Sequence, residues 1–150
     1  MPLMKPWRMR VRIVLDTNIL ISALITQGTP PDQLFQAWRE ERFDLVTSEA
    51  QLDELLQVIH RPKLQPYLSL FDAWHMVLDI YDIAEIVWQH LPDVTLSSDP
   101  DDNRILATAI AGNADLLITG DKSDLLRLEK VQNIPVLTPR QALPLLLPHV

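Results

Sequence analysis

The chain has 150 residues, the usual size of one domain, and can bury a core without a disulfide or a structural metal. It contains no cysteine, which excludes cysteine-based zinc fingers, iron–sulfur clusters and thiol catalysis. The 20 acidic residues outnumber the 13 lysines and arginines, so the net charge of -7 argues against a broad surface that coats nucleic acid. The lack of cysteine and of any long apolar run favours a cytoplasmic protein with no membrane span.

The chain begins with basic residues, and we expect an N-terminal arm over residues 1–10 followed by a single domain over residues 11–150. In the first half of that domain, short β-branched runs predict strands, and apolar residues at helical spacing predict helices. We expect strands at 11–15 and 43–47, and helices at 18–24, 32–41 and 49–60.

The second half contains a long amphipathic stretch. Its apolar positions from 70 to 89 follow one helical face and predict a helix, in which a break or a kink is compatible with the pattern. Asp99 and Pro100 form an N-cap and first-turn pair, which predicts a helix to about residue 112. The remaining elements are strands at 115–119 and 134–137 and a terminal helix at 141–147, interrupted by proline.

Strands that alternate with helices predict the α/β class, with a mostly parallel sheet covered on both faces. Ligands bind beyond the carboxyl ends of the strands in such sheets. Several acids are expected at this rim, and they come from four separate regions of the chain. They are Asp16, Glu54, the group Asp99, Asp101 and Asp102, and Asp121.

Carboxylates packed together raise one another's pKa and destabilise the fold unless a cation joins them. Oxygen ligands without histidine or cysteine select Mg²⁺ or Mn²⁺, which suit phosphodiester hydrolysis. Each acid alone also has a structural explanation: Asp99 as an N-cap, Asp101 and Asp102 as partners of the helix dipole, Glu54 as a solvated helix residue and Asp16 as a turn former. Their joint placement is what favours a metal site.

Other catalytic patterns are missing from the sequence. The four histidines are too scattered for a zinc motif, and there is no nucleophile elbow and no glycine-rich phosphate loop. Trp38, Trp74 and Trp88 fall on apolar faces of predicted helices and are expected in a core or an interface.

Five short motifs, in this order, resemble those of PIN-domain ribonucleases. The subgroup that the chain resembles is that of bacterial and archaeal toxin-type, VapC-like PIN proteins. The motifs cover most of the chain, from about residue 11 to 140. They are Val14-Leu15-Asp16-Thr17-Asn18, Leu52-Asp53-Glu54-Leu55, Arg61-Pro62-Lys63, Asp99-Pro100-Asp101-Asp102-Asn103 and Thr119-Gly120-Asp121.

The resemblance implies a three-layer α/β/α sandwich and an RNA-cleaving enzyme that uses one or two Mg²⁺ or Mn²⁺ ions. The four family acids correspond to Asp16, Glu54, Asp102 and Asp121, with Asp99 as an additional metal ligand. Asn18 and Thr119 would support the carboxylates. Many relatives are toxins that form dimers and bind a small antitoxin, so a homodimer or a higher oligomer and an antitoxin partner are expected. Whether Asp53 or Asp124 joins the site stays open at this point.

The leading hypothesis is a metal-dependent endoribonuclease. The alternative is a PIN-like module that binds RNA or protein without cutting. A phosphoaspartate receiver or phosphatase is disfavoured because position 18 is Asn and no acid precedes Asp16 in its strand. The expected phosphate contacts are Arg104, Lys122 and Arg12, and the track could extend to further arginines, namely Arg10, Arg39 and Arg42.

Overall fold

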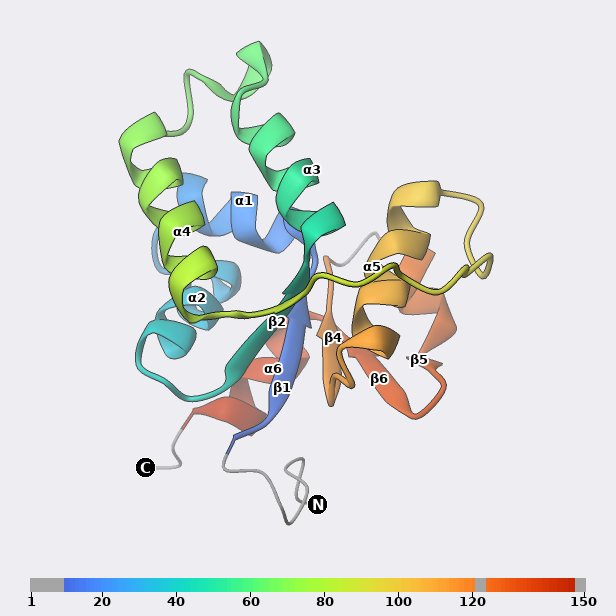
Figure 1. Cartoon of the computed structure of the whole chain (residues 1–150). Helices are drawn as coiled ribbons and strands as arrows, with labels where there is room; N and C mark the ends of the chain where they lie inside the picture. Colours follow the sequence, from blue (N-terminus) through green and yellow to red (C-terminus); the bar gives the residue numbers. More distant parts are fainter. Residues whose placement is uncertain (1–9, 121–123, 148–150) are drawn as a thin grey trace.

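The structure is a computed structural model that describes residues 10–120 and 124–147. In this part of the chain a six-stranded sheet has the order β3-β2-β1-β4-β6-β5 (Figure 1). The pairing is parallel except between β5 and β6. The strands are β1 (Arg12–Leu15), β2 (Asp44–Ser48), β3 (Glu85–Val87), β4 (Leu116–Ile118), β5 (Lys130–Val131) and β6 (Ile134–Leu137).

Helices follow most of the strands, and this alternation is the expected pattern of an α/β fold. The α-helices are α1 (Thr17–Ile25), α2 (Pro30–Arg39), α3 (Glu49–Ile59), α4 (Leu70–Ile83), α5 (Pro100–Ala111) and α6 (Pro139–Leu146). Two short 3-10 helices are η1 (Pro62–Leu64) and η2 (Asp124–Leu128). None of the helices in the described ranges is both long and apolar enough to cross a membrane.

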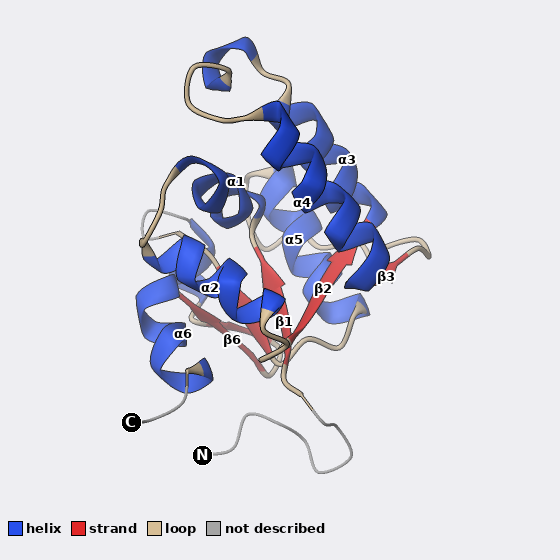
Figure 2. Ribbon diagram, turned by 90° about the vertical axis from the view of Figure 1, so that its left-hand side faces the viewer, coloured by secondary structure: helices blue, strands red, loops and turns tan. Residues whose placement is uncertain are grey.

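The sheet separates two apolar cores. Along β1, Ile13 and Leu15 point to one face and Val14 to the other, because side chains alternate along a strand. The first face is covered by α1, α2, α3, α4 and α6, and the second by α5 and η2 (Figure 2). The predicted three-layer α/β/α sandwich with a mostly parallel sheet is therefore confirmed.

The single helix predicted over residues 70–89 is wrong at its C-terminal end. Helix α4 ends at Ile83, and Ala84 adopts an extended conformation with φ -70° and ψ 155°. Residues Glu85–Val87 then pair in parallel with β2 as a strand at the edge of the sheet. The apolar positions of this strand happen to continue the helical spacing of α4, so periodicity alone could not separate the two elements.

The three tryptophans have different environments. Trp38 is buried in the larger core, as predicted. Trp74 is 43% exposed on α4, and Trp88 is 56% exposed and lies after β3 rather than on a helix. The expectation of an apolar helix face is therefore wrong for Trp88.

Two further differences lie near the C-terminus. Strand β5 was not predicted, because two residues are too short to show an alternating pattern. Helix α6 begins two residues earlier than expected, at Pro139, because Thr138 and Gln141 form a capping box. It also continues through Pro144 instead of breaking there.

Candidate acidic site

Asp16 follows the last residue of β1 and is the most buried of the described carboxylates at the rim of the sheet, with 9% of its surface exposed. Its Oδ2 accepts a hydrogen bond of 2.7 Å from the hydroxyl of Thr119, which follows the neighbouring strand β4. Burial raises the pKa of Asp16, hydrogen bonds from Thr119 and from the backbone N–H groups of Asn18 and Thr17 oppose the rise, and the charge of Asp99 adds to it. The two strand ends therefore fix this carboxylate in place.

Glu54 lies on α3 and is half-buried, while its neighbour Asp53 is exposed. Burial is the main cause of the raised pKa of Glu54, and the charge of Asp16 also raises it. Arg104 and Arg61 lower it, as does the nearby hydroxyl of Thr17. That hydroxyl is buried and has no hydrogen-bond partner of ordinary geometry among the described residues.

Asp102 lies in the first turn of α5, where Ser97 holds it in place. The Ser97 hydroxyl donates a hydrogen bond of 3.1 Å to Oδ2 of Asp102, while Asn103 exchanges two hydrogen bonds with the Ser97 backbone. The pKa of Asp102 is raised by burial first and then by the charges of Asp99, Asp16 and Asp124, while the Ser97 hydrogen bond opposes the rise. Ser97 was not predicted, because a serine in a loop carries no pattern.

Asp99 caps α5, as its sequence pattern predicted. Its Oδ1 accepts a hydrogen bond of 2.9 Å from the backbone N–H of Asp101. Asp99 also faces the other acids, because its charge raises the pKa of both Asp16 and Asp102. Asp99 can therefore cap α5 and still serve as the additional metal ligand that the sequence predicts.

These acids share a pocket of about 500 Å³, which we call the acidic pocket. It lies at the carboxyl ends of β1 and β4. One side of α3 and the first turns of α5 line it as well. Of the two neighbouring acids on α3, Glu54 lines this pocket and Asp53 does not. The lining residues are Asp16, Asn18, Glu54, Val58, Arg61, Asp99, Asp101, Asp102, Ile105, Thr119, Gly120 and Asp124.

Two predicted site residues, Asp121 and Lys122, lie outside the described residues. Asp124 is described and lines the acidic pocket, which brings it to the edge of the site. It also forms an ion pair of 3.7 Å with Arg127.

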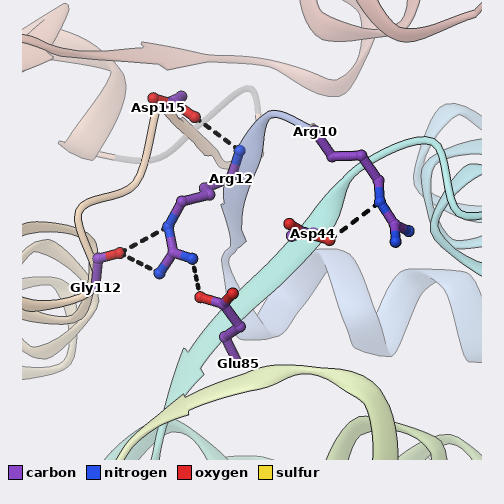
Figure 3. A network of polar contacts seen from close by, with 6 residues as sticks. All are labelled: Arg10, Arg12, Asp44, Glu85, Gly112 and Asp115. Atoms are coloured by element: carbon purple, nitrogen blue, oxygen red, sulfur yellow. Dashed lines mark hydrogen bonds and ion pairs between the residues drawn. The ribbon is translucent and has the colours of Figure 1, made fainter. Parts of the chain in front are cut away.

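The basic residues are arranged differently from the expected track. Arg12 lies at the start of β1, about 13 Å along the strand from Asp16 at 3.3 Å per residue. Figure 3 shows its guanidinium group bound to the Gly112 carbonyl oxygen and paired with Glu85. Arg10 pairs with Asp44 at the same end of the sheet. These two arginines therefore form contacts at the amino ends of the strands, away from the acidic pocket, and cannot contact RNA there.

Two other arginines lie close to the acids. Arg104 forms an ion pair with Asp101 at the start of α5. Arg61 follows α3 and lines the acidic pocket, a position that sequence reasoning missed although its motif had been noted. The signal was its spacing of seven residues, or about two helical turns, from Glu54, which places both residues on one side of α3 and its end.

The donor set fits a hard divalent cation. All candidate ligands are oxygen atoms, and three of the carboxylates have raised pKa values that a cation would relieve. The buried hydroxyl of Thr17 is a further oxygen beside Glu54. Within the described ranges, however, no three acidic or histidine side chains are grouped closely enough to hold one ion.

Comparison with known proteins gives three findings. A family model described as PIN domain matches residues 12–123. An uncharacterised protein of Methanocaldococcus jannaschii is 29% identical over 138 residues, covering 88% of each chain. The crystal structure of VapBC2 from Rickettsia felis bound to a DNA fragment from its promoter contains a chain with a similar fold, with a TM-score of 0.54 and 19% identity. That match covers 85% of this chain and 98% of the other.

Proposed function

Because the chain belongs to the PIN domain family, we propose that it is a metal-dependent endoribonuclease whose acidic pocket hydrolyses phosphodiester bonds in RNA. The observation that supports this best is the meeting of Asp16, Glu54 and Asp102 in one pocket, each with a raised pKa. Raised pKa values mean that the charged carboxylates lower the stability of the fold, and a bound cation would offset this cost.

One or two Mg²⁺ or Mn²⁺ ions would be held by Asp16, Glu54, Asp99, Asp102 and Asp121. When bound, such ions activate water and neutralise the charge of the phosphate that is attacked. Thr119 and Ser97 hold Asp16 and Asp102 in fixed orientations. Asn18, exposed on the pocket wall, can donate a hydrogen bond to phosphate oxygen.

The cations beside the pocket would guide the substrate. Arg61 lines it, and Arg104 and Lys122 are candidates for contacts with flanking phosphates. Contacts of this kind make RNA binding weaker as the salt concentration rises.

We also propose that the chain is the toxin component of a toxin–antitoxin pair. The fold neighbour in the VapBC2 complex supports this. A small antitoxin would then be its partner, and the exposed apolar residues of α4, such as Leu78, suit a homodimer or a higher oligomer.

Substitution of Glu54 by Gln tests the nuclease directly. We expect cleavage of single-stranded RNA in Mn²⁺ to fall about 10²-fold, the usual cost of removing one preorganised charge from an active site. Asp82→Asn is the matched control, because Asp82 is exposed on α4, outside the acidic pocket. Equal rates for Glu54→Gln and the control would remove Glu54 from the mechanism.

The alternative is a PIN-like module that binds RNA or protein without cutting. The specific observation in its favour is that the described acids form no group of three around one ion position. This alternative predicts no cleavage by the wild-type protein in either Mg²⁺ or Mn²⁺.

A further inference from the structure

A second and larger pocket, of about 690 Å³, lies beside the acidic pocket, and we call it the outer pocket. The segment that links β3 to α5 forms one wall, and residues from the start of α3 and from α5 form the others. Its lining residues are Ser48, Glu49, Ala50, Asp53, residues 87–94, Pro100, Asn103, Arg104 and Ala107.

The two pockets share the same walls. On α3, Asp53 lines the outer pocket and the next residue, Glu54, lines the acidic pocket. On α5, Arg104 lines the outer pocket and pairs with Asp101, which lines the acidic pocket. An RNA strand bound in the acidic pocket can therefore reach the outer pocket across α3 and α5, with the guanidinium group of Arg104 at the boundary.

Trp88 gives the outer pocket an exposed aromatic surface. Trp88 is 56% exposed, and the ring of Tyr81 lies 6.3 Å from its ring, centroid to centroid. Trp88 belongs to neither apolar core. Aromatic rings in proteins that bind single-stranded nucleic acid stack on bases of any kind.

We propose that the outer pocket binds an unpaired base of the RNA substrate, stacked on Trp88, while Arg104 contacts the phosphate of the same strand. This inference rests on the proposed function and adds to it that the substrate is single-stranded where it flanks the cleaved bond. The pocket volume is ample for one nucleotide, and drug-sized ligands occupy pockets of similar size. The carboxylate of Asp53 can accept a hydrogen bond from an amino group of the base.

The test measures binding apart from cleavage. All variants carry Asp16→Asn so that bound RNA stays intact, and a labelled single-stranded RNA decamer is titrated by fluorescence anisotropy. Adding Trp88→Ala should weaken binding about 5- to 150-fold, the fold-change for 1–3 kcal/mol per stacked base. Trp88→Phe should recover most of the loss, since phenylalanine keeps a ring that can stack.

Trp74→Ala is the matched control, because Trp74 is 43% exposed on α4 and lines neither pocket. A second variant, Arg104→Gln, should reduce the slope of log affinity against log salt by about one phosphate contact. Melting temperatures close to that of the parent show that each variant is folded.

Unchanged RNA binding by Trp88→Ala would overturn the proposal and leave the outer pocket to another occupant, such as a protein segment. Failure of the parent protein to bind the decamer would overturn it as well. A loss of binding that depends on Trp88, in a wild-type protein that does not cleave, would support the base pocket while contradicting the proposed nuclease.

Discussion

Replacing Asp16 by Asn is expected to reduce RNA cleavage in Mn²⁺ by about 10²–10³-fold, at the upper end for a single preorganised group. Asp16 is the most buried acid of the acidic pocket, and Thr119 holds its Oδ2 at 2.7 Å. The substitution keeps the shape of the side chain and removes its charge. Full cleavage activity in this variant would show that Asp16 takes no part in the reaction.

The same variant should not be less stable than the wild type without metal. The pKa of Asp16 in the folded chain lies above its ordinary value of 3.8, chiefly because the carboxyl is buried. Protonated Asp16 therefore favours the fold below about pH 3.8, and this contribution is lost as the pH rises through the raised pKa. Asn avoids that loss, so at neutral pH and without metal we expect a melting temperature equal to or higher than that of the wild type. A clearly lower melting temperature would mean that Asp16 is needed for folding.

Substitution of Gln51 by Leu is expected to cause the largest loss of stability. Gln51 is 3% exposed, donates a hydrogen bond of 2.5 Å from Nε2 to the Leu15 carbonyl oxygen and accepts one of 2.6 Å from Thr47. Leucine leaves two buried polar groups without these partners, which costs about 2–4 kcal/mol and lowers the melting temperature by roughly 5–15 °C. Because Leu15 precedes Asp16, cleavage activity should fall as well.

Gln57→Leu is the control for this loss, because Gln57 is exposed on the same helix. Thermal unfolding followed by circular dichroism measures both variants. If Gln51→Leu unfolds at the temperature of the control, the buried hydrogen bonds do not stabilise the strand end.

The central part of the fold could be predicted from the sequence because its signals are local. The run that ends at Asp16 is apolar and β-branched, and Asp99 with Pro100 forms a clear helix start. The match of the family model to residues 12–123 confirms the resemblance drawn from the motifs. Strand β3 could not be predicted, because three residues that continue a helical pattern carry no strand signal.

The site was predicted less completely, because several of its contacts join distant segments. Ser97 supports Asp102 from a loop, and Arg61 lines the acidic pocket from just beyond the end of α3. Arg12 shows the opposite error: it is four residues from Asp16 in sequence, but it lies at the other end of the extended strand β1. Because a strand is extended, residues that are close in sequence along it can lie far apart in space.

Titration of the metal-free protein with Mn²⁺, followed by melting temperature, tests the metal site most directly. A cation that binds only the folded state adds about 2.7 kcal/mol at a concentration 100 times its Kd. We expect a saturable rise in melting temperature for the wild type and for Asp82→Asn, and none for Asp16→Asn. No rise for the wild type, or an equal rise for Asp16→Asn, would contradict a metal held by the acidic pocket.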